Sequence, residues 1–472
     1  MIQSVSDEVL LNIFRCFLDV YPRYWPRLVH TCHKWRQIVF ASQGALRLRL
    51  LCTHGTPVQR GLDCWPTLPI VVQYGGSLEL DPSAPEDEEN IMTALKQSNR
   101  VISINLTITS PLQAKLSMIE LPFSKLEDLV LLSPDSVRHL IQPRGFRSGQ
   151  GATRLRSLHL TRIAFLELSQ LLYSSRNLVK LQLHQVLYPS NFSTEEFMMA
   201  LSRMSQLRLL SLHFLPPANH FAKSLLLPSR KRVALPSLTR FDFRGITNVL
   251  KHLVARFDAL LLGDIELTSF IEPISDLSVL IEFIDRINMH KSPRRADILS
   301  SEHDITICLT QPGVHTCLRL KLLCEPLTTQ LSSMARICIQ FSAFLLNVED
   351  LRIIVERQPR RDDGPDDELW LLETLNVFVG VKWLQVSGNF SRNIVKSLQR
   401  RNRWGKSVLL TLHKLCVLQP GPCHASLRDA IGSLITSRRL SDHHPIAVEY
   451  EQVLHASELL RVTSALTGTV NS

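Results

Sequence analysis

The sequence predicts an α/β fold in which a small helical domain precedes a long, irregular series of short parallel strands and helices. Ten times between residues 101 and 417 an aliphatic or aromatic residue is followed, three and five positions later, by two more. Segments with helical spacing, at 164–174, 194–204 and 248–260, separate some of these triplets. The first forty residues instead carry two apolar stripes at helical spacing, which predicts a pair of helices.

Composition supports a folded protein with more than one domain. The 472 residues are 45% hydrophobic and 20% charged, which is ordinary for globular chains. No apolar run approaches the roughly 18 residues that a membrane span needs, and the start lacks the basic and apolar regions of a secretory leader. We therefore expect a cytoplasmic or nuclear protein that contacts no membrane.

The ten cysteines include no C-x-x-C pair. The nearest to a cluster are Cys308, Cys317 and Cys324, at apolar positions of expected strands. We expect reduced thiols, because disulfides are rare inside cells. His443-His444 and Cys32-His33 lack further ligands at zinc spacing, so the sequence indicates neither a metal nor another cofactor.

The first expected helix begins near Ser6, whose hydroxyl can cap it, and Asp7 and Glu8 suit its positive end. Its stripe runs from Val9 to Phe17, and a second stripe runs from Leu28 to Val39. Two helices this short cannot bury both stripes against each other, so they need a further domain or another protein.

These residues resemble an F-box, whose pattern is Leu-Pro-x-Glu, several aliphatics and Ile-Phe, followed later by Val-Cys-Lys/Arg-x-Trp-Arg/Lys. Here the two blocks are residues 5–14 and 29–38, with Val5-Ser6 in place of Leu-Pro and a longer linker between the helices. The resemblance implies an F-box over residues 1–45 that docks on a Skp adaptor and, through it, on a cullin. The residues expected to form the docking surface and the core that supports it are Val5, Val9, Leu10, Ile13, Phe14, Leu28, Val29, Cys32 and Trp35. An ordinary helical hairpin packed on the chain's own core is the alternative.

The triplets resemble an irregular leucine-rich repeat. They begin at Val101, Leu126, Leu155, Leu178, Leu207, Leu238, Leu262, Val348, Val381 and Leu412. Each unit could hide its apolar face only by stacking on its neighbours, as in a solenoid. We expect a connector and N-terminal cap at 46–100, the repeats at 101–420 and a C-terminal cap at 421–472. This arrangement resembles large fungal F-box families along most of the chain.

The repeats are interrupted between 268 and 347. Residues 304–309 and 317–322 alternate apolar and polar side chains on either side of a turn at 311–313, which predicts two antiparallel strands. Residues 332–345 are expected to form the helix that leads into the strand after Val348.

The sequence contains no recognised catalytic motif. The resemblance implies a non-catalytic substrate receptor of a Skp–cullin–F-box ubiquitin ligase, which binds a target protein on its repeats. Two alternatives stay open: a leucine-rich-repeat scaffold outside any ligase, and an enzyme with a site in 268–347. The net charge of +10 invites a nucleic-acid partner, but only Trp404 is interleaved with the basic clusters, so we expect none.

Target capture is expected on side chains that face outward between the buried aliphatics of each triplet. There, basic residues recur in successive triplets: Arg156, Lys180, Arg208 and Arg240. Stacked strands would align them into a basic stripe for an acidic or phosphorylated segment. Solvent-facing strand positions are also often basic without any partner.

Overall fold

The computed structural model describes residues 5–21, 24–53, 58–74, 85–119, 122–133, 139–141, 153–165, 168–186, 194–214, 232–270, 277–287, 293–301, 303–311, 313, 317–323, 327–355, 366–387, 391–400, 408–419, 425–440 and 445–452. The chain is mixed α/β, with a large, mostly parallel set of strands, which confirms the fold class at that level. It divides into two compact units, Met1–Leu207 and Arg208–Ser472. Among the described residues, no helix is both long and apolar enough to cross a membrane.

The first unit opens with three helices, α1 (Asp7–Val20), α2 (Trp25–Thr31) and α3 (His33–Ala41). The prediction of two helices was wrong, because Cys32 breaks the second stripe. Its backbone is extended, with φ −159° and ψ 169°, and no helix continues through that conformation. The apolar period nevertheless runs through the break, since α2 and α3 bury their side chains in the same core.

The remaining helices of the first unit are α4 (Val58–Cys64), α5 (Pro85–Leu95), α6 (Ser110–Leu116), α7 (Leu168–Ser174) and α8 (Thr194–Leu201). Its main strands, in spatial order, are β1 (Leu50–Cys52), β2 (Ile70–Tyr74), β3 (Val101–Thr107), β4 (Asp128–Leu132), β6 (Ser157–Thr161) and β8 (Lys180–Val186). All of these pair in parallel. A second, two-stranded sheet joins β5 (His139–Ile141) to β7 (Ile163–Phe165).

The second unit has ten main strands among its described residues. In spatial order they are β9 (Leu209–Phe214), β11 (Arg240–Ile246), β13 (Asp264–Phe270), β16 (Cys317–Leu323), β15 (Asp304–Thr310), β14 (Arg295–Ser300), β17 (Asp350–Val355), β18 (Trp383–Ser387), β19 (Lys414–Gln419) and β20 (Ala447–Gln452). A short parallel pair joins β10 (Val233–Ala234) to β12 (Phe257–Asp258). The helices are α9 (Thr247–Val254), α10 (Ser278–Arg286), α11 (Leu327–Gln340), α12 (Ser342–Leu345), α13 (Asp366–Val377), α14 (Ser391–Gln399) and α15 (Ala425–Leu440).

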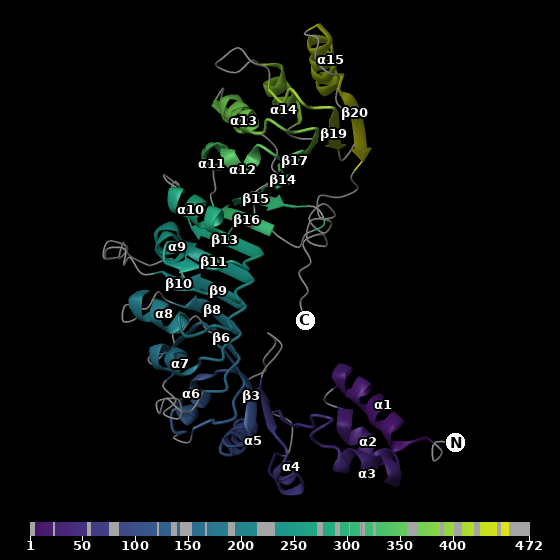
Figure 1. The fold of residues 1–472 in the computed structure, drawn as a ribbon, viewed down its shortest axis with the longest axis vertical. Coiled ribbons are helices and arrows are strands. Elements are labelled where there is room, and N and C mark those ends of the chain that lie inside the picture. The colour runs from purple at the N-terminus through teal and green to yellow at the C-terminus, as the bar shows by residue number, and fades with distance from the viewer. Residues whose placement is uncertain are drawn as a thin grey trace. The chain divides into compact units, whose positions relative to one another are not determined.

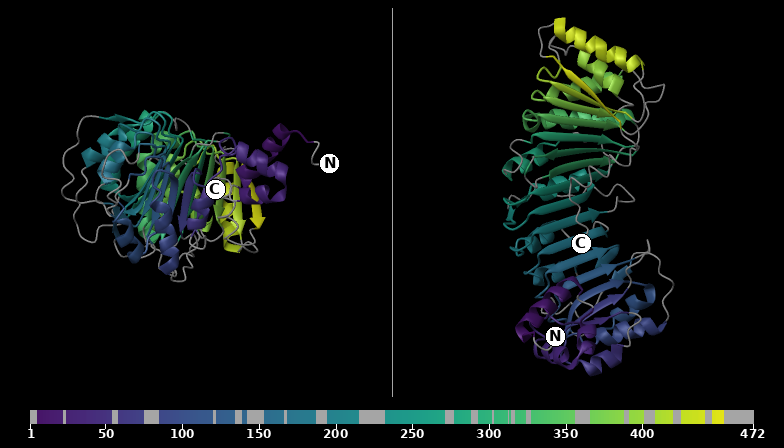
Figure 2. Two further views of the ribbon diagram at one scale, coloured as in Figure 1. Left: turned by 90° about the horizontal axis from the view of Figure 1, so that it is seen from below. Right: turned by 90° about the vertical axis from the view of Figure 1, so that its right-hand side faces the viewer.

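Every predicted triplet is followed or overlapped by a strand, and the strands of each unit lie side by side with helices along one face (Figures 1 and 2). The triplet residues point to that face: Leu158 and Leu160 of β6 are completely buried. In the second unit a chain of edge-on aromatic contacts links strand to helix, with ring centroids 5.3 Å apart for Phe241–Phe257 and 5.2 Å for Phe257–Phe283. Burial of such side chains stabilises the packing of the strands against the helices.

Several predicted boundaries differ from the structure. The helix expected from Ala164 begins only at Leu168, because residues 163–165 form β7. The helix expected to end at Leu260 ends at Val254, since the chain turns into β12. The antiparallel pair expected in 268–347 is present as β15 and β16. The third strand, β14, was not predicted; it pairs antiparallel with β15 and parallel with β17.

Candidate functional site

The first candidate surface belongs to the helical head, which we define as residues 5–48. Its core contains Leu10, Phe14, Leu18, Trp25, Leu28, Val29, Ile38, Val39, Leu46 and Leu48. Ser6 caps α1 by accepting from the Val9 amide at 3.4 Å, and Asp7 and Glu8 occupy the first turn. Lys34 of α3 donates to the Val5 carbonyl at 2.7 Å and pairs with Asp7 at 3.1 Å. These contacts fix the start of α1 against α3.

The exposed side of α1 carries a line of apolar side chains next to the polar Asn12, Arg15 and Asp19. Val9, Ile13 and Val20 are 49%, 52% and 66% exposed, and Cys16 is exposed between them. Their spacing of four, three and four residues aligns them on one side of the helix. We call these four residues the α1 stripe. Apolar side chains aligned in water over three turns are typical of a surface that another protein covers.

The structure separates the nine residues predicted for adaptor docking and its core into three groups. Leu10, Phe14, Leu28 and Val29 lie in the core of the head. Val9, Ile13 and Cys32 are exposed, whereas Val5 and Trp35 are partly buried against the core. The Trp35 ring meets Phe14 edge-on at 4.8 Å, so Trp35 supports the core of the head while remaining partly exposed.

Sequence reasoning missed the far end of this surface. Val20 continues the α1 stripe, and Tyr21 and Tyr24 beyond it are 51% and 41% exposed. The Arg27 guanidinium lies 4.3 Å from the centre of the Tyr24 ring. Extending the spacing of Val9 and Ile13 by two more turns would have identified Val20, but the tyrosines follow the end of the helix and carry no periodic signal.

The second candidate surface is the strand face opposite the helices, where the target-binding residues were predicted. In the first unit Arg156 and Lys180 are exposed neighbours at the starts of β6 and β8, and the Lys180 amide donates to the Arg156 carbonyl at 2.9 Å. Asp128 of β4 lies close to both. Burial and then the nearby Glu127 raise the pKa of Asp128, while Arg49, Lys180 and Arg156 oppose this rise. The surface is therefore of mixed charge.

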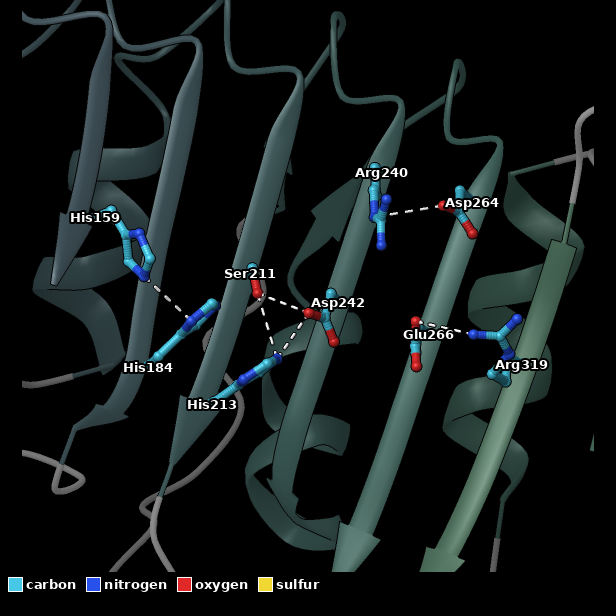
Figure 3. Close-up of polar contacts among 9 residues, drawn as sticks. All are labelled: His159, His184, Ser211, His213, Arg240, Asp242, Asp264, Glu266 and Arg319. Atoms are coloured by element: carbon cyan, nitrogen blue, oxygen red, sulfur yellow. Dashed lines mark hydrogen bonds and ion pairs between the residues drawn. The ribbon is translucent and has the colours of Figure 1, made fainter. Parts of the chain in front are cut away.

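The second unit places Arg208 and Arg240 side by side at the starts of β9 and β11. Arg240 of β11 pairs with Asp264 of β13 at 3.4 Å (Figure 3). Two residues further along β13, Glu266 contacts Arg319 of β16, also at 3.4 Å. Arg240 and Arg319 are thus each paired with an acid of β13, the strand between them. The alignment of all four predicted basic residues into one stripe would span both units and stays a prediction.

Ser211, His213 and Asp242 meet in the second unit, but not with the geometry of a hydrolase triad. Asp242 accepts from Ser211 at 2.7 Å and lies 2.7 Å from His213 Nε2, and the same nitrogen is 3.4 Å from the serine oxygen (Figure 3). A triad needs the two imidazole nitrogens to serve serine and aspartate separately. Here one nitrogen faces both, so the histidine cannot relay a proton between them.

Within either unit, the other polar clusters among the described residues supply few ligands for a cofactor. Within the second unit His213 and Asp242 supply two metal ligands, fewer than the three or four protein ligands of a typical zinc site. In the first unit His159 and His184 lie 3.3 Å apart, and Thr161 is 3.0 Å from His159. An open hollow of 650 Å³ is lined by Thr153, Gln170, Tyr173, Ser174, Arg176 and Asn177, a set with no general-base carboxylate or histidine.

No protein-family model matches the chain, and no curated protein matches it. The F-box resemblance therefore depends on the residues of the N-terminal segment alone and stays a prediction.

Proposed function

We propose that this protein is the substrate-recognition subunit of a Skp–cullin–F-box ubiquitin ligase. In this proposal the helical head is the F-box and docks on the Skp adaptor. The strands and helices that follow form an irregular leucine-rich-repeat solenoid that captures a target protein. The contribution to ubiquitin transfer is positional, since the receptor raises the effective concentration of target lysines near the charged conjugating enzyme.

The α1 stripe is the observation that carries the proposal. It lies within the segment that resembles an F-box, on a helix whose other face is already buried. Complete burial of a valine or isoleucine contributes roughly 1.5–3 kcal/mol. Because Val9 and Ile13 are about half exposed, docking would gain roughly 1 kcal/mol from each. Together they would account for a change of about 30-fold in affinity.

The test replaces Val9 and Ile13 by aspartate and measures capture of purified Skp adaptor by the full chain. Both positions are exposed, so the head should stay folded, as circular dichroism would verify. We expect the dissociation constant to rise at least about 30-fold, because two carboxylates would also have to leave water. The matched control is Leu260→Asp with Leu261→Asp, at positions that are 73% and 63% exposed in the second unit.

Equal adaptor capture by wild type, the α1 variant and the control would contradict docking through this helix. Failure of the wild-type chain to bind any Skp adaptor would favour the alternative function, a repeat scaffold outside ubiquitin ligases. Truncating Trp35 is a poorer test, since its contact with Phe14 would also weaken the core of the head.

For the target we propose the strand face, with Arg156 and Lys180 in one unit and Arg208 and Arg240 in the other. The acids beside them indicate a target segment that offers both signs of charge, rather than a uniformly acidic one. Reversing all four charges should leave adaptor binding unchanged and abolish co-purification of targets from cells. Retained target binding would move the site to other parts of the chain.

A further inference from the structure

Two thiols face each other on neighbouring strands of the second unit. The Sγ atoms of Cys308 in β15 and Cys317 in β16 are 3.1 Å apart, about 1 Å more than the ~2.05 Å of a disulfide bond. The strands are antiparallel, with Cys308 opposite Arg319 and Cys317 opposite Thr310. The two cysteines are therefore diagonal neighbours on one face of the sheet.

The surroundings distinguish the two thiols. Arg319 lies directly across from Cys308. The hydrogen bond from Cys317, and then Arg319, lower the pKa of the Cys308 thiol against the effect of burial. The same hydrogen bond and burial raise the pKa of Cys317. Acids face the pair from both sides: Asp297 pairs with Cys308 in register, Asp264 with Cys317, and Glu266 contacts Arg319.

We propose that Cys308 and Cys317 are an oxidation site at which a peroxide joins β15 to β16 through a disulfide. The Cys308 thiolate attacks one peroxide oxygen, the O–O bond breaks, and the leaving hydroxide takes a proton to become water. The Cys317 thiol then attacks the resulting sulfenic acid. The S–S bond forms, the S–O bond breaks, and a second water leaves with the thiol proton. A nucleophilic cysteine beside a resolving partner is what this chemistry requires.

Other thiols of the chain lack this arrangement among the described residues. Cys16, Cys32 and Cys64 are exposed. Burial raises the pKa of Cys52 to about 11 and that of Cys338 to about 12, which keeps both protonated and unreactive. The oxidation rates of Cys16, Cys32 and Cys64 therefore show how fast an exposed thiol reacts. The rates of Cys52 and Cys338 show how fast a buried, protonated thiol reacts.

The test titrates the reduced, full-length protein with hydrogen peroxide and then unfolds, alkylates and digests it with trypsin. The tryptic peptide 296–319 contains Cys308 and Cys317 and no other cysteine. We expect this peptide to become two hydrogen atoms lighter and resistant to alkylation, on the order of tenfold faster than Cys64 is oxidised. Dithiothreitol should restore both thiols.

Two variants test the order of events. In Cys317→Ser the sulfenic acid of Cys308 should persist and be trapped by dimedone. In Cys308→Ser the Cys317 thiol should stay alkylatable at the same peroxide dose. The proposal is overturned if, in the wild type, Cys16, Cys32 and Cys64 are oxidised while peptide 296–319 still takes up two alkyl groups. Rapid oxidation of Cys317 in Cys308→Ser would overturn the assignment of Cys308 as the nucleophile.

Discussion

Arg352 of β17 tests how a buried charge affects the free energy of unfolding of the second unit's sheet. Its side chain is only 10% exposed and its Nε lies 3.8 Å from Asp297, whereas Arg295 contacts the same carboxylate at 3.1 Å. Its Nε and Nη1 atoms are buried without a hydrogen-bond partner among the described residues. Burial accordingly lowers the pKa of Arg352. The guanidinium is therefore desolvated and poorly compensated.

This arrangement predicts opposite effects for the two partners. Arg352→Met removes the desolvated charge and leaves Asp297 its shorter contact, so the free energy of unfolding should rise by about 1 kcal/mol. Asp297→Asn leaves two arginines side by side and should lower it by about 3 kcal/mol. In the double variant most of that loss should disappear, because the uncompensated arginine is gone.

Urea unfolding followed by circular dichroism would measure these differences. Arg336→Met, at an exposed position of α11, controls for the change in side-chain type and should stay within about 0.5 kcal/mol of wild type. The reasoning is refuted if Arg352→Met destabilises the protein as much as Asp297→Asn does, since Arg352 would then be well solvated or well paired.

Four further substitutions test packing and charge. A Cβ added at Gly380 would lie 2.7 Å from the Leu346 carbonyl oxygen, so Gly380→Ala should lower the free energy of unfolding by about 1–3 kcal/mol. Gly432 lies inside α15 with open space around it, so Gly432→Ala should raise the free energy of unfolding by about 0.5–1 kcal/mol. Melting temperatures would show both changes. Buried Arg438 donates to two backbone carbonyls at 2.8 Å, and Arg438→Met should lower the free energy of unfolding by about 2 kcal/mol; a melting temperature equal to that of wild type would contradict this. The pKa of Asp128 is raised in the folded protein, so its charged form opposes folding. Asp128→Asn should therefore stabilise the protein at neutral pH, and this gain should vanish as the pH falls through the folded pKa toward the ordinary value of 3.8. A gain in stability that does not depend on pH would exclude this cause.

The strands were predictable because their inner face repeats within each short segment. Leu155, Leu158 and Leu160 are all completely buried, so one pattern reports both the strand and its orientation. The pattern weakens in β14, where the outward-facing Asp297 interrupts the apolar residues. The break at Cys32 was invisible for a related reason, because the helical period of buried residues continues through it.

The candidate surfaces were less predictable than the strands. Sequence spacing places Arg240 on the outward face, but its contact with Asp264 depends on the register between strands that lie far apart in the chain. The α1 stripe was half predicted, as its spacing is local. The contact between Cys308 and Cys317 also required the register, although the sequence had already placed these thiols near each other.

The order in which β14, β15 and β16 pair within the second unit has a consequence for the order of folding. Along the chain β14, β15 and β16 follow β13, yet it is β16 that pairs with β13, and β14 that pairs with β17. A stack of repeats can normally lengthen one neighbour at a time. Here the edge of β13 stays unpaired until the chain has reached residue 323, and β17 docks on a strand made about fifty residues earlier. During folding from the N-terminus, pairing therefore has to wait twice before the next strand edge is covered. A chain truncated within residues 271–316 would lack β16 and leave this edge of β13 exposed.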